Sequence, residues 1–452
     1  MNIIIVGVGR VGEKLAAQLN AEGNNVTIVD QNAIKVKAIA NKYDIMGVIG
    51  NGASRSTQTE AGINKTDLLI AVTGNDELNL LSCLMAKKSS NCRTIARLKN
   101  PEYNMDSSYF QNELGLAMVI NPELAAAKEI ARILNFPSAI KIETFAKGRV
   151  EMLTFKLPED SRLVGMSVKD AIMKFRSSIT FCTVERGDDV HITNGNFVFE
   201  GKDVISFIAS PTVAKNFFKK IDYQTQPIKN ALIVGGGPIT YYLLEQLEGS
   251  GISCTVVEKD NAICSHLATD FDKVTVINAD PADEDVLREE GIGKADCFLS
   301  LTGFDEENIL LSLFAKKSGC RKTVTKINRI DFDDITRHLE LDTIVYPKNI
   351  TADMIVRYVR ALNNTKGSNI ETVYNLFKGK IEVAEFTVKE GSPIVGKALM
   401  DLSLKPGVLI ATIQRGRMQI APRGQDVILA GDTVVIVTKG LLLKDISDIL
   451  KK

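Results

Sequence analysis

Apolar runs of strand length alternate with helix-like segments from the start of the chain. Ile3–Val6 is apolar at every position, as expected for a parallel strand that is buried on both faces. From Gly12 onward, Leu15 and Leu19 recur at helical spacing, and Gly23 follows where such a helix would end. This pattern predicts a strand followed by a helix that packs on the sheet.

The same alternation continues along the chain. Further strands are predicted at Val26–Asp30, Ile45–Ile49, Leu68–Thr73 and Arg93–Leu98, with helices at Ala33–Lys42 and Asn75–Lys88. Consecutive βαβ units build a doubly wound parallel sheet with right-handed crossovers.

This pattern occurs twice. The segment IIIVGVGRVG (Ile3–Gly12) recurs as ALIVGGGPIT (Ala231–Thr240), and Gly62–Ser89 recurs as Gly291–Ser318. The offset between the copies stays at 228 or 229 residues, which is too steady for chance similarity. The chain is therefore predicted to be an internal duplication.

Each copy continues into a smaller region of short alternating strands, with one helix predicted at Val168–Phe175 in the first copy. Val150–Ala171 resembles Ile381–Leu402, so the duplication includes these regions. We expect an α/β protein with two Rossmann-type domains (residues 1–136 and 227–365), each followed by a small α+β domain (residues 137–226 and 366–452).

A glycine motif directly follows the first strand and opens the first helix, which is the context in which it indicates dinucleotide binding. Gly7 permits a tight turn, Gly9 lets a phosphate approach the backbone, and Gly12 allows close helix packing. The helix N-terminus offers free N–H groups to a pyrophosphate. Arg10 is a weaker phosphate ligand because side chains at that position often point to solvent. The candidate residues of this loop are Gly7, Val8, Gly9, Arg10, Val11 and Gly12.

An acid ends the second strand at Asp30, where such folds accept hydrogen bonds from ribose hydroxyls. Gln31 and Asn32 follow it, with no arginine to receive a 2′-phosphate, and this favours NAD over NADP. Adenosine, ribose and phosphate are common to NAD, NADH, ADP and ATP, so these residues do not separate the four ligands.

Three further loops follow strands at the edge of the sheet where ligands bind. Asn51 with Gly52, and Thr73 with Gly74, either line the nucleoside or serve as simple turns. Arg97 either neutralises phosphate charge across the cleft or forms a surface ion pair.

The second copy carries an altered version of this site. Glu258 replaces Asp30 as an acid that suits ribose, whereas Thr240 replaces the third glycine and is expected to crowd the helix against the strand. Pro238 is expected to stiffen the turn. The candidate residues in this copy are Gly235, Gly236, Gly237, Pro238, Ile239, Glu258 and Lys326.

The loop after the third strand also differs between the copies. Asp280 and Pro281 are matched to Gly52 and Ala53, and Lys326 stands in for Arg97. We therefore expect weaker or different nucleotide binding in the second copy.

Composition excludes several other functions. Lys plus Arg and Asp plus Glu number 55 each, so no excess of positive charge attracts nucleic acid or anionic lipid. No apolar run is long enough to span a membrane, and the N-terminus does not resemble a signal peptide. The seven cysteines lack CxxC spacing and the three histidines are well separated, which argues against disulfides and metal sites. A cytoplasmic protein without a metal is expected.

Catalytic chemistry is not expected. Tyr374 and Lys378 have the spacing of a Tyr–Lys proton relay, but the repeat places Lys378 in a hairpin turn. Glu185–Gly187 and Gln414–Gly416 are interpreted as exposed hairpin turns, where a small regulatory ligand is a minor alternative. An NAD-dependent oxidoreductase remains the alternative function.

The tandem order of large and small domains resembles the RCK (or KTN) regulators of potassium transport. The resemblance covers essentially the whole chain. It is carried by MNIIIVGVGRVGEKLA, Asp30, GNGAS, DLLIAVTGNDELNLLSCLMAKK, the ARLKNPEY run and the paired segments LVGMSVKDA and IVGKALMDL.

This resemblance implies that the large domains bind NAD(H) or the adenine nucleotides ATP and ADP. It also implies that tandem chains dimerise into a ring, which gates a potassium-translocating membrane subunit. The implied principal site is Gly7, Gly9, Gly12, Asp30, Thr73 and Arg97, and the implied second site is Gly235, Gly237, Glu258 and Lys326, with Thr240 and Pro281 as departures. A nucleotide sensor that regulates a different ion transporter is the other alternative.

Overall fold

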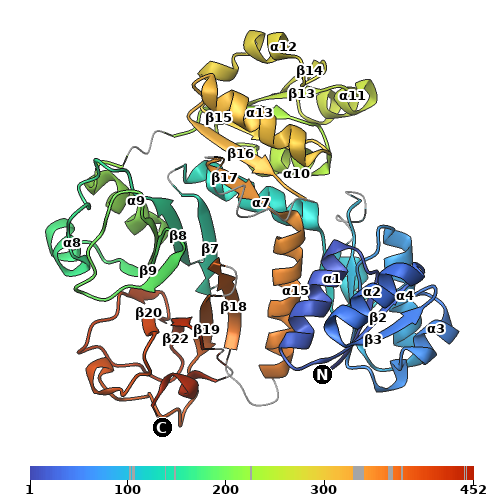
Figure 1. The fold of residues 1–452 in the computed structure, drawn as a ribbon, viewed down its shortest axis with the longest axis horizontal. Helices are drawn as coiled ribbons and strands as arrows, with labels where there is room; N and C mark the ends of the chain where they lie inside the picture. Colours follow the sequence, from blue (N-terminus) through green and yellow to red (C-terminus); the bar gives the residue numbers. More distant parts are fainter. Residues whose placement is uncertain are drawn as a thin grey trace. The chain divides into compact units, whose positions relative to one another are not determined.

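The computed structural model describes residues 1–100, 103, 107–137, 139–146, 149–223, 227–328, 339, 341–364, 370–377, 380–441, 443 and 445–451. The chain forms two compact units (Figure 1). Unit one contains Met1–Ala131 and Lys229–Val356, and unit two contains Arg132–Ile228 and Arg357–Lys452. Each unit therefore combines the corresponding parts of both sequence copies. The domain boundaries predicted above stay a proposal.

The first copy in unit one is a six-stranded parallel sheet with helices on its faces. Its strands are β1 (Asn2–Val6), β2 (Asn25–Asp30), β3 (Met46–Ile49), β4 (Leu68–Ala71), β5 (Arg93–Arg97) and β6 (Met118–Ile120). Its helices are α1 (Arg10–Ala21), α2 (Ala33–Tyr43), α3 (Arg55–Glu60), α4 (Asp76–Ser89), α6 (Ser107–Asn112) and α7 (Pro122–Asn135), with a short 3-10 turn η1 (Ile63–Lys65). The strand order is β3-β2-β1-β4-β5-β6.

This order confirms the predicted Rossmann-type fold. β1 pairs in parallel with both β2 and β4, so the strand order reverses at β1. Ligands bind beyond the carboxyl ends of the strands at such a switch point. The four apolar residues of β1 are buried, and Leu15 and Leu19 of α1 pack on the sheet as the spacing predicted.

The second copy in unit one has the same topology, in the order β14-β13-β12-β15-β16-β17. Its strands are β12 (Asn230–Val234), β13 (Ser253–Glu258), β14 (Thr275–Asn278), β15 (Cys297–Ser300), β16 (Lys322–Lys326) and β17 (Thr343–Val345). Its helices are α10 (Pro238–Leu247), α11 (Asn261–Asp270), α12 (Glu284–Glu289), α13 (Asp305–Lys317) and α15 (Pro347–Asn364), with η3 (Ile292–Lys294).

The two copies in unit one contact each other through equivalent positions. Asn121, which precedes α7, donates from Nδ2 to the hydroxyl of Tyr242 on α10 at 2.8 Å. Lys14 of α1, the counterpart of Tyr242, donates from Nζ to Asn349 Oδ1 on α15 at 2.8 Å. Each copy thus sends its last helix toward the glycine-loop helix of the other copy.

Unit two consists of two five-stranded antiparallel sheets, ordered β10-β9-β11-β8-β7 and β18-β19-β22-β20-β21. The first contains β7 (Lys141–Phe145), β8 (Val150–Lys156), β9 (Thr180–Arg186), β10 (Asp189–Ile192) and β11 (Val204–Ala209), with α8 (Val168–Phe175) and α9 (Pro211–Lys220). The second contains β18 (Ile370–Leu376), β19 (Ile381–Thr387), β20 (Val408–Arg415), β21 (Met418–Ile420) and β22 (Thr433–Lys439), with the 3-10 turns η5 (Leu399–Asp401) and η6 (Ile446–Ile449).

The prediction of one helix in the first small domain was incomplete. Helix α8 lies where it was predicted, but α9 is a second helix, which begins at Pro211 and buries Phe217 and Phe218. Proline suits the first helical position because its missing N–H would have no partner there. The segment has only ten residues, with few buried apolar positions, so its helical spacing was difficult to recognise in the sequence.

The two sheets of unit two share one apolar cluster. Phe145 and Met152 of the first sheet lie in the same buried cluster as Val383 and Val435 of the second. Tyr374 of β18 packs edge-on against Phe145 with ring centroids 4.9 Å apart. Its hydroxyl donates to the carbonyl of Thr144 at 2.9 Å, and burial raises its pKa. Tyr374 is therefore a partly buried residue of a strand that packs against this cluster, whereas Lys378 lies outside the described residues.

The predicted hairpin turns are present, but their arginines are not simply exposed. Arg186 donates from Nε and Nη2 to the two carboxylate oxygens of Asp203, each at 2.8 Å. Arg415 makes the same pair of bonds to Asp432, at 2.9 and 2.8 Å. Both aspartates are buried, so each ion pair, with its two hydrogen bonds, fixes the hairpin to the sheet.

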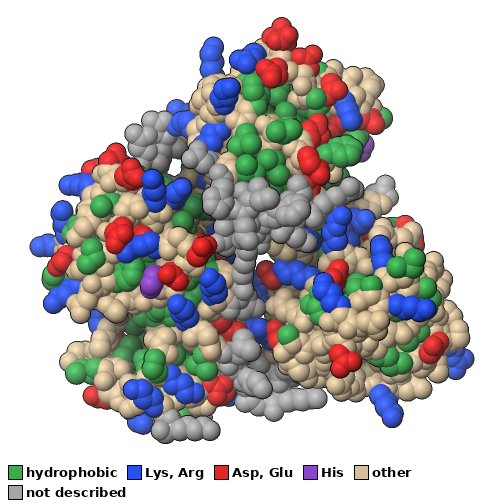
Figure 2. All heavy atoms as spheres, in the orientation of Figure 1, with side chains coloured by type: hydrophobic (Ala, Val, Ile, Leu, Met, Phe, Trp, Pro, Cys, Tyr) green, Lys and Arg blue, Asp and Glu red, His purple; other side chains and the backbone are tan. Residues whose placement is uncertain are grey.

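Surface and thiol chemistry agree with the composition. Acidic and basic side chains are interspersed over the visible face (Figure 2), consistent with 55 residues of each kind. Throughout the described ranges, no helix has both the length and the apolar character needed to cross a membrane. All seven cysteines are buried and free, and burial raises the pKa of the Cys254 thiol to about 11.

The ion pair between Arg415 and Asp432 leads to a prediction about stability. Asp432→Ala should lower the free energy of unfolding by about 2–3 kcal/mol, because it leaves Arg415 without its partner and removes an acceptor for the N–H of Leu429. Urea unfolding of the full chain measures the change. The control is Glu390→Ala, at an exposed position. Equal urea midpoints for the two variants would contradict a stabilising role of the ion pair.

Candidate functional site

The glycine loop between β1 and α1 contains two glycines that the fold requires. Gly7 has a φ of +100°, and a Cβ there would lie 2.8 Å from the backbone nitrogen of Thr73. A Cβ on Gly12 would lie 1.9 Å from the carbonyl oxygen of Gly7. Gly9, in contrast, is the N-cap of α1 and has no atom within 4 Å of a built Cβ. Gly9 thus leaves open space in front of the helix N-terminus.

The other loop residues have distinct positions. Helix α1 begins at Arg10 and not at Gly12 as predicted, since the N–H of Glu13 already bonds the carbonyl of Gly9 at 2.8 Å. Val8 and Val11 are buried, so only their backbones can face a ligand. Arg10 is exposed and donates from Nη1 to the carbonyl of Asn328 at 3.2 Å.

Asp30 lies directly beside this loop. Its Oδ2 accepts the N–H of Val8 at 2.7 Å, and its Oδ1 accepts the N–H of Asn32 at 2.9 Å. Bonds to an ionised acceptor are stronger than neutral ones, so Asp30 holds the loop as well as presenting a carboxylate at the cleft. The N–H of Val8 is therefore engaged by Asp30.

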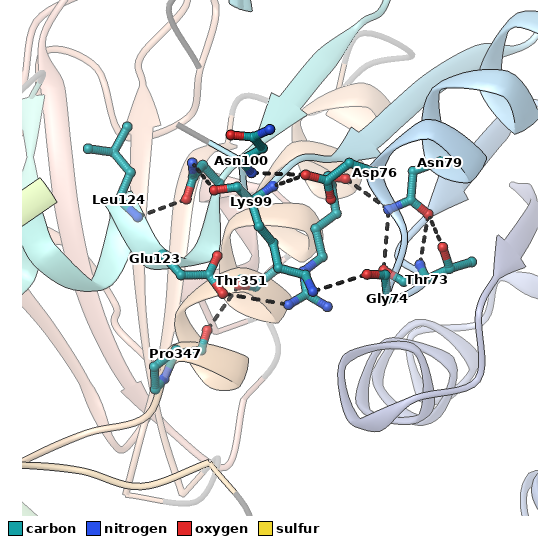
Figure 3. Close-up of polar contacts among 12 residues, drawn as sticks. Thr73, Gly74, Asp76, Asn79, Lys99, Asn100, Glu123, Leu124, Pro347 and Thr351 are labelled. Atoms are coloured by element: carbon teal, nitrogen blue, oxygen red, sulfur yellow. Dashed lines mark hydrogen bonds and ion pairs between the residues drawn. The ribbon is translucent and has the colours of Figure 1, made fainter. Parts of the chain in front are cut away.

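The loop after β4 is held by a residue that sequence reasoning missed. Asn79 of α4 is fully buried, and its Oδ1 accepts the N–H and the hydroxyl of Thr73 at 2.8 and 2.7 Å (Figure 3). Its Nδ2 donates to the carbonyl of Arg97 at 2.8 Å. Asn79 therefore links the carboxyl ends of β4 and β5.

A buried carboxylate on the same helix was also missed. Asp76 accepts the N–H groups of Lys99 and Asn100 at 2.8 and 2.9 Å, and the amine of Lys99 reaches the carbonyl of Gly74 at 3.1 Å (Figure 3). The signal for both residues was present, because the run Thr-Gly-x-Asp-Glu-x-Asn occurs at Thr73–Asn79 and again at Thr302–Asn308.

The loop after β3 is shaped by its own contacts. Asn51 Oδ1 accepts the N–H of Ala53 at 2.9 Å. A Cβ on Gly52 would lie 2.1 Å from Val6 Cγ1, so this loop packs directly on β1. These contacts give Asn51 and Gly52 turn roles, and their contact with a nucleoside stays a prediction.

Arg97 ends β5 at the same edge of the sheet. Its Nη2 lies 3.8 Å from Glu123 Oε1, with 18% and 19% of the two side chains exposed, so Arg97 forms an ion pair, as the alternative supposed, but a largely buried one. Burial raises the pKa of the Glu123 carboxyl, and the positive charge of Arg97 offsets this in part. Within the described part of the chain, Arg97 Nε and Glu123 Oε2 lack hydrogen-bond partners. This unsatisfied nitrogen is buried beside Glu123, so a contact between Arg97 and a phosphate stays a prediction.

The second copy has the same contacts among its glycine loop, its acid and its buried asparagine. Gly235 has a φ of +96°, and Glu258 accepts the N–H of Gly236 at 2.7 Å and the N–H of Asp260 at 2.8 Å. Asn308 accepts the N–H of Thr302 at 2.9 Å and donates to the carbonyl of Lys326 at 3.0 Å.

The structure places the two residues that set the second glycine loop apart from the first. Thr240 is fully buried, but its hydroxyl donates to the carbonyl of Gly235 at 2.5 Å, so the expected crowding becomes a hydrogen bond. Pro238 lies directly after the turn, and the stiffening expected of it stays a prediction. It is the first residue of α10, after the N-cap Gly237, and the buried Ile239 follows it.

The pairing of the loops after β3 and β14 also needs correction. Asp280 Oδ1 accepts the N–H of Ala282 at 2.9 Å, as Asn51 does for Ala53. Asp280 is therefore the counterpart of Asn51, and Pro281 is the counterpart of Gly52. One residue more separates the copies here than in the glycine loops, because of a single insertion upstream.

Lys326 is less available than its counterpart Arg97. It is buried, its Nζ donates to the carbonyl of Leu301 at 3.1 Å, and burial lowers its pKa.

Comparison with known families agrees with this architecture. The model of the TrkA-N domain matches residues 3–122 and 231–347, and the model of the TrkA-C domain matches residues 152–222 and 383–451. The chain belongs to the TrkA family.

Curated relatives match along the whole length. The Trk system potassium uptake protein TrkA homolog 1 of Methanosarcina mazei is 31% identical over 463 residues, with 100% of both chains covered. The Trk system potassium uptake protein TrkA of Haemophilus influenzae is 32% identical over 448 residues, covering 96% of this chain and 95% of its own.

Solved structures share the fold. The GsuK channel superposes with a TM-score of 0.65 at 15% identity, covering 97% of this chain and 77% of its own. The GsuK RCK domain gives a TM-score of 0.63 at 15% identity, covering 97% and 92%. The predicted RCK-type fold is therefore confirmed.

The glycine geometry predicts different effects for two alanine variants. Gly12→Ala should cost about 1–3 kcal/mol of stability, because its Cβ collides with the carbonyl of Gly7. Gly9→Ala is the matched control and should be neutral, since its φ of −77° suits alanine and the space around it is open. Thermal unfolding of both variants checks this. Equal destabilisation of the two variants would refute the distinction.

Proposed function

We propose that this chain is a regulatory subunit that binds NAD(H) or ATP/ADP in its first Rossmann-type domain. The observation that carries the proposal is the bond from Asp30 to the glycine loop at 2.7 Å, at the reversal of strand order. It supports a site in which Asp30 accepts a hydrogen bond from a ribose while the N-terminus of α1 faces a phosphate.

The residues present fit a phosphate-bearing ligand. Gly9 leaves the space that a Cβ would fill, and the exposed Arg10 carries positive charge at the start of α1. Arg97, although paired with Glu123, ends β5 at the same edge of the sheet. Asp30 keeps acceptor capacity for a ribose, since each carboxylate oxygen can accept more than one hydrogen bond.

The partner is proposed from the family. The relatives above are named potassium uptake proteins of the Trk system, and other GsuK structures are titled as bound to NAD and to ADP. We propose that this chain dimerises through its tandem domains and works at the cytoplasmic face of the membrane. Its partner there is a potassium-translocating, TrkH-like subunit.

Regulation of that partner would follow from thermodynamic linkage. A nucleotide shifts the equilibrium between two ring conformations only by its difference in affinity for them. Coupling free energies of this kind are typically about 1–3 kcal/mol. The chain itself would carry out no chemical step, and this part of the proposal is supported by Tyr374, whose hydroxyl and ring are engaged by Thr144 and Phe145.

Asp30→Ala tests nucleotide binding. The variant should bind adenine nucleotides about tenfold more weakly or worse, because a charged acceptor for the ribose is lost. It should still fold, since Asp30 lies at the cleft and not in the core. Calorimetric titration with NAD, NADH, ADP and ATP measures the change, with the exposed Glu60→Ala as control. Unchanged affinity for all four ligands would refute the site.

The regulatory role needs a separate measurement. Potassium flux through the reconstituted membrane subunit should depend on this chain and change when nucleotide is added, and Asp30→Ala should remove the nucleotide response. If potassium flux is the same with and without this chain, and the chain oxidises NADH in the presence of a substrate, the oxidoreductase alternative is supported instead.

A further inference from the structure

We propose that the second small domain, which contains the sheet of β18–β22, docks an acidic, amphipathic segment of a partner protein on an exposed surface formed by Met400, Met418 and Leu429. We call these three residues the Met–Leu surface. They belong to unit two, whereas both glycine loops belong to unit one. A protein partner at this surface is therefore separate from the ligand of either glycine loop.

The first small domain shows what the fold accepts at these positions. The N–H of Met400 donates to a glycine carbonyl at 2.9 Å, and the N–H of Lys169 makes the same bond in the first domain. Met418 pairs with the arginine across its hairpin, and Asp189 does so in the first domain. The residues of each pair therefore occupy equivalent places in the two domains.

Leu429 and Glu200 are the third equivalent pair. Each donates its N–H, at 2.8 Å, to the buried aspartate that holds the hairpin arginine. All three positions are exposed in the first domain, where the residues are charged. In the second domain the apolar residues are exposed by 63%, 57% and 43%, in chain order. Folding therefore does not require apolar side chains here, and their presence needs another reason.

Met400 and Met418 both lie next to the turn that carries Leu429. A Cβ built on Gly424, in this turn, would lie 3.3 Å from Met400 Cβ. The carbonyl of Val427 accepts a bond at 2.7 Å from the arginine that pairs with Met418. Exposed apolar residues that gather in this way mark interaction sites, and methionine adapts its shape to a partner.

Basic residues accompany the Met–Leu surface. Lys397, Arg417 and Arg423 are exposed, and each lies in a segment that contributes to this surface. We call these three residues the basic rim. Asp401 is also exposed, whereas a carboxylate oxygen of Asp426 already accepts the N–H of Arg423 at 2.6 Å. The rim is therefore positive on balance.

The composition of the whole domain agrees with a positive rim. Residues 366–452 contain 13 Lys and Arg against nine Asp and Glu. Three of these acids are buried, namely Glu382, Glu385 and Asp432. The surface of this domain is therefore positive on balance, although the chain as a whole has 55 residues of each kind.

The charges of the rim select among the possible occupants. A second copy of the same surface would bring like charges together. The cytoplasmic loops of membrane proteins carry an excess of Lys and Arg, so the rim repels them as well. Recognition of anionic lipid generally uses about four to eight basic residues, more than the rim supplies. An acidic segment with apolar side chains on one face is the occupant that complements both the Met–Leu surface and the basic rim.

Binding of a designed peptide to the full chain tests this docking surface. The probe is a synthetic amphipathic helix with leucine on one face and glutamate on the other, and its control has lysine in place of every glutamate. The wild type should bind the acidic peptide at least about tenfold more tightly than the lysine peptide, because only glutamate complements the basic rim. Fluorescence anisotropy of the labelled peptides measures both affinities.

A triple variant removes the apolar residues. Met400→Lys, Met418→Asp and Leu429→Glu together introduce the residues of the first small domain, so the variant should keep the wild-type midpoint of thermal unfolding. It should bind the acidic peptide at least about tenfold more weakly, because the leucines lose their apolar contact. The matched control is Met173→Lys in α8 of the first small domain, since Met173 is 57% exposed and should leave the affinity unchanged.

A double variant tests the charges separately. Arg417→Gln with Arg423→Gln keeps the Met–Leu surface and removes two charges of the basic rim. It should lower the preference for the acidic peptide over the lysine peptide at least about threefold. An unchanged preference would overturn the role of the rim.

Other outcomes would overturn the docking surface itself. These are no binding of the acidic peptide to the wild type, equal affinity of the wild type and the triple variant, and an equal loss in Met173→Lys. If the triple variant changes the oligomeric state in sedimentation, the surface joins copies of this chain instead. If vesicles of phosphatidylcholine and phosphatidylserine bind the wild type but not the triple variant, the surface contacts lipid instead. Either result overturns the assignment to an acidic protein segment.

Discussion

A carboxylate that holds a glycine loop is the interaction on which both halves of unit one depend. Asp30 and Glu258 each accept a loop N–H at 2.7 Å, and each also accepts an N–H two residues beyond itself. These bonds join the end of the second strand to the turn after the first strand. They therefore fix the loop at the switch point without a ligand, and such preorganisation would reduce the ordering cost of the proposed binding.

Steric contacts hold the loops on the other side of each glycine turn. Gly7 and Gly235 adopt positive φ angles against the loops that contain Thr73 and Thr302. Buried Asn79 and Asn308 then fasten those loops to the ends of β5 and β16. The chain has kept this arrangement in both copies while the side chains around it diverged. Duplication followed by divergence explains how one chain holds two similar glycine loops with different charged residues nearby, such as Arg97 in the first copy and Lys326 in the second.

Pairing of the copies gives the duplication a structural consequence. In unit one the contacts of Lys14 and Tyr242 with the last helix of the opposite copy join the two Rossmann-type domains. In unit two a single apolar cluster joins the two antiparallel sheets. Each unit is thus a pseudo-symmetric pair within one chain. A ligand that changes one glycine-loop helix acts on contacts with the other copy, which is the physical basis for coupling in the proposed regulator.

The sequence by itself determined the duplication, the Rossmann-type class, and the placement of Gly7, Gly9, Gly12 and Asp30, because these depend on local patterns of burial, turn geometry and spacing. It did not reveal Asn79, the bonding of Thr240 or the partner of Arg97. Arg97 meets Glu123 across two different loops, whereas Asn79 and Thr240 bond residues six and five positions away, where the geometry of the folded turn decides the partner. Helix α9 was missed because a helix of ten residues shows little periodicity in the sequence. The pairing of Asp280 with Asn51 was missed because a shift of one residue changes the similarity between the copies very little. Only the tertiary structure decided which polar groups satisfy one another, because hydrogen-bond partners are set by the folded backbone and not by spacing along the sequence.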